Sequence, residues 1–124
     1  MSDGLTRTIY NEARGEGEVG MRAVASTIYN RSKLNRGYLG GKDFNEICRK
    51  GYDGYKIDAN PTHPGDIRAW HIAEEIANEM RSENFHPTNN YTHFATTRNA
   101  FVRYEGPNFE YKEQIGNHYF FREH

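Results

Sequence analysis

The sequence predicts an α+β fold in which helices come first and short strands follow. Segments with apolar residues at helical spacing occupy the first 81 positions, whereas the last third carries short β-branched and aromatic runs between turn-forming residues. A chain of 124 residues is long enough to bury one core and too short for two. We therefore expect a single domain over residues 1–124, mainly helical, with a short antiparallel β region toward the C-terminus.

The first expected helix runs to about Arg14. Ser2 or Asp3 provides a side-chain oxygen that can cap its N-terminus, and Gly15 and Gly17 can adopt the backbone conformations that end it. Its apolar face comprises Leu5, Ile9 and Tyr10.

The second helix is the clearest, and it is expected over residues 18–33. Glu18 favours the positive N-terminal end of this helix. Its apolar face, at the spacing i, i+3, i+4, i+7, comprises Met21, Val24, Ala25 and Ile28. The other face comprises Arg22, Ser26 and Arg31.

Two further helices follow, each preceded by a loop. Residues 35–41 are a loop, and residues 43–49 form a short helix with Phe44, Ile47 and Cys48 facing inward. Residues 51–64 are irregular and rich in polar and aromatic side chains, which is typical of a binding loop. The next helix spans about 65–81. Its buried stripe comprises Ala69, Ile72, Ala73, Ile76, Ala77 and Met80.

The expected strands lie after residue 87. Asn89 and Asn90 supply turn chemistry, and residues 91–96 have the length and the β-branched or aromatic content of a strand. A second extended pair is expected near 101–104, and residues 114–121, with His118 in an extended segment, close the chain.

The composition limits the classes of partner. Lys plus Arg (16) nearly balances Asp plus Glu (17), so the chain lacks the basic field that nucleic-acid binding needs. Hydrophobic residues reach only 35%, yet nine Tyr and seven Phe are present. Rings with polar tips suit a groove for sugars, although tyrosines also simply fill the boundary between core and water.

Targeting and cysteine usage set further expectations. A single cysteine, Cys48, rules out an internal disulfide. Residues 1–4 carry neither a basic nor an apolar stretch of a signal peptide, and no apolar run approaches the roughly 20 residues of a membrane span. We expect a monomer made as a soluble cytoplasmic chain that does not insert into membranes.

Glu12 is the candidate catalytic residue. It lies within residues 10–18, where a helix stops at glycines and leaves a carboxylate beside an arginine. Partial burial at a helix end would raise its pKa, as a general acid working near neutral pH requires. The alternative is a solvated loop of three glutamates and an arginine.

Rival chemistries have weaker support. The six histidines show neither a His-Glu-x-x-His pattern nor a tight pair, so we expect no metal and no other cofactor. Cys48 falls on the inner face of its short helix, where free cysteines are usually inert.

Motifs at both ends of the chain carry a family resemblance. The chain resembles the SleB/CwlJ-type cell wall hydrolases in Glu12-Ala13-Arg14-Gly15-Glu16-Gly17, Gly20-Met21, Ala23-Val24-Ala25, Asn30-Arg31, Thr92-His93-Phe94 and Ile115-Gly116-Asn117-His118-Tyr119-Phe120. The segment Gly54-Tyr55-Lys56-Ile57-Asp58 departs from the family pattern, which leaves the register of that loop open.

The resemblance implies a lysozyme-like fold and cleavage of the glycan strands of peptidoglycan, with the motif glutamate, here Glu12, as the catalytic acid. A compact catalytic domain without a leader is similar to phage or prophage lysis enzymes released by a holin, which implies action at the cell wall after release. A small spore-associated hydrolase is the other origin.

The reaction type is decided by the number of carboxylates. A glycosidase usually employs two, and Glu16, Asp53 and Asp58 are the available partners for Glu12. A lytic transglycosylase needs only one, because the substrate's own C6 hydroxyl attacks and leaves a 1,6-anhydro-muramyl end. The resemblance implies this one-glutamate mechanism, so we expect it, with Glu16 in a structural role, paired with Arg14 or Arg31 or accepting N–H groups at the start of the second helix. A hydrolytic muramidase or glucosaminidase and a non-catalytic wall-binding or virion module are the alternatives.

Six further residues are candidate substrate contacts: Tyr55, Tyr91, Thr92, His93, Asn117 and His118. Strand alternation sends His93 to the face opposite Thr92 and Phe94, where it can donate to a sugar hydroxyl or N-acetyl group. The alternative is a half-buried histidine satisfied by a backbone carbonyl. Gly116 permits a tight bend, so Asn117 and His118 can instead brace the end of the first helix.

Overall fold

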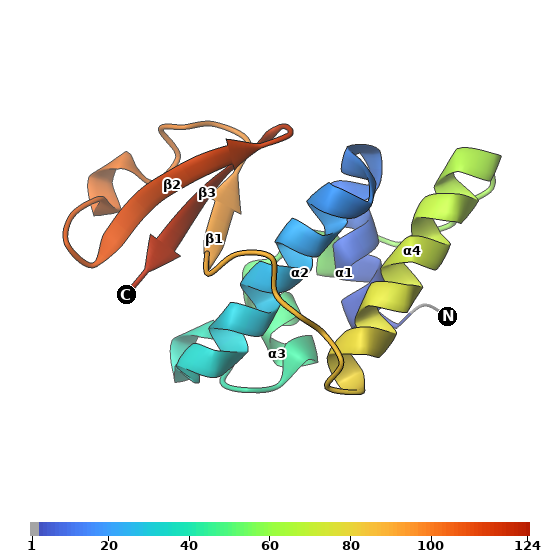
Figure 1. The fold of residues 1–124 in the computed structure, drawn as a ribbon, viewed down its shortest axis with the longest axis horizontal. Coiled ribbons are helices and arrows are strands. Elements are labelled where there is room, and N and C mark those ends of the chain that lie inside the picture. The colour runs from blue at the N-terminus through green and yellow to red at the C-terminus, as the bar shows by residue number, and fades with distance from the viewer. Residues whose placement is uncertain (1–2) are drawn as a thin grey trace.

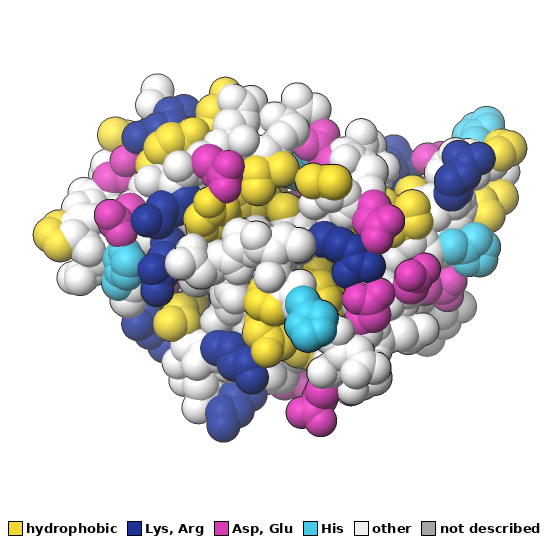
Figure 2. Space-filling model, in the orientation of Figure 1, with side chains coloured by type: hydrophobic (Ala, Val, Ile, Leu, Met, Phe, Trp, Pro, Cys, Tyr) yellow, Lys and Arg dark blue, Asp and Glu magenta, His cyan; other side chains and the backbone are white. Residues whose placement is uncertain are grey.

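A computed structural model describes residues 3–124 and confirms the α+β fold. Within this range four α-helices form one part of the molecule, and a three-stranded antiparallel sheet near the C-terminus lies beside them, on the α2 side (Figure 1). Acidic and basic side chains both occur over the helical and the sheet parts of the face seen in that view (Figure 2).

Helix α1 (Gly4–Ala13) begins and ends where the sequence indicated. The Asp3 carboxylate caps it by accepting the Thr6 N–H at 3.0 Å. Ser2, the alternative cap, lies outside the described residues. A 3-10 helix, η1 (Arg14–Glu16), follows and leads directly into helix α2. Gly17 makes this transition with a φ of 73°, a left-handed value that glycine adopts at little cost.

Helix α2 (Gly17–Leu34) lies between the sheet and the other helices (Figure 1). Its predicted apolar face is confirmed, since Met21, Val24, Ala25 and Ile28 are all buried. Its opposite face is also largely shielded from solvent, because Ser26 is fully buried and Arg31 is only 6% exposed. The segment that leads into the sheet covers this face, and Arg31 donates through Nε to the Thr92 carbonyl at 2.7 Å.

Helices α3 (Phe44–Gly51) and α4 (Pro64–Arg81) complete the helical part. Asp43 caps α3 by accepting the Glu46 N–H at 2.9 Å, and Ile47 and Cys48 are fully buried, as predicted. The predicted stripe of α4 is likewise buried, with Ile72 partly so. Short 3-10 helices occur before and after α3: η2 (Gly37–Leu39) and η3 (Asp53–Lys56), the latter within the expected irregular loop.

The sheet has the order β1-β3-β2, with both pairs antiparallel. Strand β1 (His93–Ala95) pairs with β3 (His118–Glu123), so that His93 stands opposite Phe121 and Phe94 opposite Phe120. Strand β2 (Phe109–Ile115) pairs with the other edge of β3.

One strand prediction is wrong. Residues 101–104 do not extend: Val102–Tyr104 is a 3-10 helix, η4, and the ring of Phe101 turns onto Phe121 instead. In the closing segment Gly116, at a φ of 59°, makes the tight bend expected there, and this bend is the turn between β2 and β3. Strand β2 was missed because an edge strand tolerates the charges of Glu110, Lys112 and Glu113, which weaken its alternation.

Candidate active site

The Glu12 carboxyl lies in the last turn of α1 and is partly buried against η3. Its Oε2 accepts the backbone N–H of Gly54 at 2.8 Å. Burial raises the pKa of Glu12; the Gly54 bond opposes the rise, and the negative charge of Asp53 adds to it. The net direction is upward, so this carboxyl keeps its proton to a higher pH than an exposed glutamic acid does.

Three side-chain bonds hold η3 along one side of α1. Arg7 donates through Nε to the Tyr55 carbonyl at 2.8 Å, and its guanidinium lies 4.8 Å from the centre of the Tyr55 ring. One turn further on, Asn11 donates through Nδ2 to the carbonyls of Gly54 at 2.9 Å and Ile57 at 2.6 Å. These bonds fix the loop that the sequence left open, and they place Tyr55 next to the residue that binds Glu12.

Gly54 allows the loop backbone to approach this closely. A Cβ atom at this position would lie 3.1 Å from Asn11 Cβ, Glu12 Cγ and Glu12 Oε2. Those distances are tighter than ordinary van der Waals contact, so a side chain here would force the carboxyl to move.

Tyr52, a buried residue whose pKa responds to the charge of Glu12, packs with Arg31 between α2 and the sheet. The Tyr52 hydroxyl shares a hydrogen bond with Thr27 Oγ1 at 2.7 Å, and the Arg31 guanidinium lies 4.7 Å from the centre of its ring. Burial raises the pKa of Tyr52 to about 12, with the Glu12 charge adding to the rise. The Tyr52 ring also contacts Phe94 of β1 at 5.9 Å between centroids, which connects this region to the sheet.

Glu16 connects the end of α1 to the β2–β3 turn. It accepts the backbone N–H of Asn117 at 2.7 Å and the Asn117 side-chain amide at 3.0 Å. Glu16 therefore has a structural contact, although with the turn instead of the expected Arg14, Arg31 or N–H groups of α2. Asn117 occupies the bracing position that the sequence offered as its alternative to touching substrate.

The residues around the start of β1 are held by internal bonds. Tyr91 donates its hydroxyl to Glu113 of β2. Thr92 is buried, and its Oγ1 accepts the Glu123 N–H at 2.8 Å and shares a hydrogen bond with His93 Nδ1 at 2.9 Å.

His93 and His118 lie on opposite faces of the sheet. His93 packs edge-on against Phe101 and Phe109, with centroids 5.7 and 5.1 Å away, whereas His118 packs edge-on against Phe94 at 4.9 Å. The predicted alternation of His93 and Phe94 is confirmed. Burial lowers the pKa of His93 to about 3, with the Arg31 charge adding to the fall, and burial also lowers that of His118. His118 thus lies on the Phe94 side, which contacts Tyr52, and His93 on the other.

Among the predicted carboxylate partners, Asp53 is the one whose charge reaches Glu12. Both aspartates are exposed, but Asp53 immediately precedes Gly54 in η3, whereas Asp58 lies beyond the end of that helix. Sequence reasoning could not choose between them, because the choice depends on the three bonds that hold η3.

Other chemistries find no support within residues 3–124. No group of three His, Cys, Asp or Glu side chains there is placed to hold a metal ion. Burial raises the pKa of Cys48 to about 12, so its thiol stays protonated at neutral pH and is a poor nucleophile. In the same range, no helix has the length and apolarity that a bilayer crossing requires.

A family model described as Cell Wall Hydrolase matches residues 15–121, which is most of the chain. The chain belongs to the cell wall hydrolase family. This confirms the resemblance seen in the sequence and makes the chain an enzyme that degrades peptidoglycan. The match to the cell wall hydrolases begins three residues after Glu12, so the assignment of that residue depends on the geometry described above. No curated protein and no solved structure matches the chain.

Three residues of this region were missed as site residues by sequence reasoning. Tyr52 and Gly54 lie in the segment whose register was open, and nothing local distinguishes them from other loop residues. Arg31 belongs to a family motif, but helical periodicity placed it on the face opposite the core. A charged residue next to the buried stripe gives no signal of burial in a single sequence.

Proposed function

We propose that this cell wall hydrolase is a lytic transglycosylase that cleaves the MurNAc–GlcNAc bond of peptidoglycan on a lysozyme-like fold, with Glu12 as its one catalytic carboxyl. The observation that carries the proposal is the partly buried Glu12 carboxyl, whose pKa is raised by burial at the end of α1. A proton donor for a glycosidic oxygen requires this environment, because the group must still hold its proton near neutral pH.

The reaction balances with one carboxyl. Glu12 gives its proton to the glycosidic oxygen, the bond from the MurNAc C1 to that oxygen breaks, and positive charge develops on the ring. The C6 hydroxyl of the same MurNAc then attacks C1, and its proton passes to the Glu12 carboxylate. The products are a free GlcNAc 4-hydroxyl and a 1,6-anhydro-muramyl end, and Glu12 is again protonated. No water is consumed.

The Gly54 N–H has a defined part in this cycle. A hydrogen bond from an N–H group is stronger to a carboxylate than to a carboxylic acid. The bond therefore tightens after Glu12 has given up its proton, and it stabilises the ion pair with the developing sugar cation. Burial works in the other direction and favours the protonated form of the resting acid, so burial assists proton donation and the Gly54 bond assists the step after it.

Among the expected sugar contacts we retain Tyr55, a half-buried residue on the 3-10 helix that reaches Glu12. Its flat ring suits the apolar face of an amino sugar. His118 is only 8% exposed and packs against Phe94, which supports a structural role for it. Tyr91, Thr92, His93 and Asn117 also have bonds or ring contacts within the fold, which supports structural roles for them.

A hydrolytic muramidase or glucosaminidase is the second candidate, and the charge of Asp53 at Glu12 favours it. In a hydrolase Asp53 would be the second carboxylate, acting on a water or on C1. The two candidates give different products from the same bond.

Mass spectrometry of muropeptides released from purified sacculi tests the proposal. We expect anhydro-muramyl ends from the wild-type chain and a loss of about 100-fold or more in their rate of formation for Glu12→Gln. Glu75→Gln is the matched control, because Glu75 is an exposed acid on α4. Circular dichroism of both variants verifies folding. New reducing ends would establish the hydrolase, no new ends would indicate a wall-binding module, and full activity of Glu12→Gln would exclude Glu12 as the acid.

A further inference from the structure

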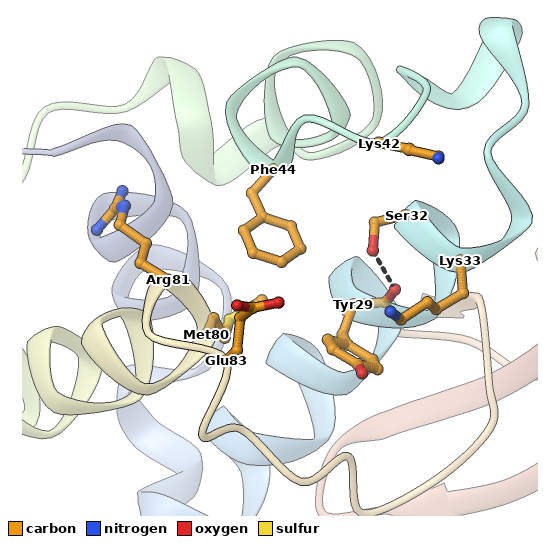
Figure 3. Close-up of a pocket in the computed structure, with 8 residues that line it drawn as sticks. All are labelled: Tyr29, Ser32, Lys33, Lys42, Phe44, Met80, Arg81 and Glu83. Carbon is orange, nitrogen blue, oxygen red and sulfur yellow. Dashed lines mark hydrogen bonds between the residues drawn. The ribbon is translucent and has the colours of Figure 1, made fainter.

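A hollow of about 710 Å³ opens where α2, α3 and α4 meet, at the end of α1 remote from Glu12. Figure 3 shows its lining: Tyr29, Ser32, Lys33, Lys42, Phe44, Met80, Arg81 and Glu83. Lys33 and Lys42 lie on one side and Arg81 on the other, with Phe44, Tyr29 and Glu83 between them (Figure 3). Its size is in the range of small-ligand sites.

The charge of the lining is positive and partly uncompensated. Arg81 forms an ion pair with Asp3. Lys33 lies 5.0 Å from the centre of the Tyr29 ring, and within residues 3–124 neither Lys33 nor Lys42 has a carboxylate partner. The hollow therefore offers two ammonium groups to an incoming anion.

The remaining lining residues define the rest of the ligand. Phe44, Tyr29 and Met80 provide apolar contact, and Glu83 is the one acid in the lining. A ligand that satisfies all of them carries carboxylates for the lysines, small apolar groups for the rings and an ammonium group for Glu83. A short acidic peptide containing a diamino acid has this combination. A phosphodiester polymer has no cation for Glu83 and would be repelled by it.

The hollow lies at the N-terminal end of α1 and Glu12 at its C-terminal end. From Asp3, which pairs with Arg81, to Glu12 is nine residues, or roughly 14 Å of helix. Between them, a Cβ on Gly4 would meet the Tyr55 ring at 2.6 Å and Asn45 Oδ1 at 3.1 Å. Asn45 follows the Phe44 of the hollow, and Tyr55 belongs to η3, which reaches Glu12. Asn45 and Tyr55 therefore both lie against the start of α1, the end at which the hollow opens.

We propose that this hollow binds the peptide stem of peptidoglycan, with its carboxylates at Lys33 and Lys42 and its diamino-acid ammonium at Glu83. This assignment rests on the proposed function, because a chain that cleaves glycan strands meets the acidic stems attached to their muramyl sugars. It deepens that function by adding recognition of the peptide to cleavage of the sugar bond.

Binding of a free stem peptide tests the inference without any cleavage. The probe is synthetic L-Ala-γ-D-Glu-L-Lys-D-Ala, titrated into the ¹⁵N-labelled chain. We expect shifts of the amide signals of residues 29–33, 42–44 and 80–83, with a dissociation constant on the order of 1 mM. The double variant Lys33→Gln/Lys42→Gln should bind about tenfold more weakly. The control Arg68→Gln/Lys112→Gln, which removes two cations from other surfaces, should bind as the wild type does.

Two further arms separate the alternatives. The same peptide with its carboxylates converted to amides should lose binding to the wild-type chain, which tests the lysines without any variant. Absence of shifts in the hollow, equal affinity of the double variant, or tighter binding of poly(glycerol phosphate) than of the peptide would overturn the proposal. Because the peptide has no glycosidic bond, its binding stands or falls independently of the activity of Glu12.

Discussion

The backbone N–H of Gly54 reaches the Glu12 carboxyl across 42 positions of sequence and binds it at 2.8 Å. This contact makes the loop after α3 a part of the acid's environment. The loop supplies the N–H that favours the ionised carboxyl and the Asp53 charge that disfavours it, while burial sets the larger upward shift of the pKa. The positions of Asp53 and Gly54 therefore modulate how readily Glu12 gives up its proton.

Replacing Gly54 with alanine should reduce activity far more than stability. The new Cβ would lie 3.1 Å from two Glu12 atoms, so the carboxyl must shift by a few tenths of an ångström and its bond to the N–H lengthens. We expect the rate on sacculi to fall about tenfold or more, because a misplaced proton donor is costly. Gly65→Ala is the control, since a Cβ in the first turn of α4 meets nothing within 4 Å. Equal activity of both variants would show that the carboxyl position is not critical.

Replacing Asp53 with asparagine should move the pH profile. The charge of Asp53 raises the pKa of Glu12, so its removal lowers that pKa. A general acid is active only while protonated, and the alkaline limb of kcat/KM should therefore shift to lower pH. Asp58→Asn, at an exposed loop position, should leave the limb where it is.

The maximal rate of Asp53→Asn, read from the same pH profile, distinguishes a transglycosylase from a hydrolase. A transglycosylase keeps most of its maximal rate in Asp53→Asn, because Asp53 takes no part in bond making. A loss of about 100-fold at every pH would instead identify Asp53 as a second catalytic carboxylate. An unchanged profile in both position and height would show that Asp53 does not act on Glu12.

The helices could be predicted from the sequence because their buried apolar residues recur at the helical spacing i, i+3, i+4, i+7. Met21, Val24, Ala25 and Ile28 are all buried, as their spacing required. The same reasoning failed for Arg31, since periodicity identifies the most apolar face and cannot tell that a central helix is covered on a second side. It also failed for β2, where an edge strand carries charges that a buried strand would exclude.

The candidate site was predictable only in part for a related reason. Glu12 stands at a helix end, and a helix end can be located from glycines and an apolar face. Its hydrogen-bond partner Gly54 comes from a loop whose path depends on bonds from Arg7 and Asn11 to backbone carbonyls. These bonds cannot be predicted from the residue types of the loop, because every residue has a backbone carbonyl that can accept a hydrogen bond.

Replacing Gly116 with alanine should loosen the attachment of the sheet to the helices. Gly116 has a φ of 59°, and an added Cβ would lie 1.9 Å from Glu16 Oε1, the atom that accepts the Asn117 N–H. Left-handed backbone strain and the loss of that bond together should lower the free energy of unfolding by about 2 kcal/mol. Urea denaturation measures this. Gly37→Ala, where a Cβ meets nothing within 4 Å, is the control, and equal midpoints for the two variants would contradict the assigned role of the turn.

His93 should make the fold sensitive to acid. Burial lowers its pKa to about 3 in the folded chain, against an ordinary value of 6.5, so the unfolded chain binds the proton more tightly. The stability that the neutral ring contributes is complete above about pH 6.5 and is lost as the pH falls toward 3. In His93→Gln, which cannot take up this proton, the melting temperature should fall less steeply between pH 7 and pH 4 than in the wild type. His71→Gln, a change at a side chain 70% exposed, should keep the wild-type slope. If the His93 variant also keeps that slope, the ring is hydrated in the folded state and the aromatic cluster around it is open to solvent.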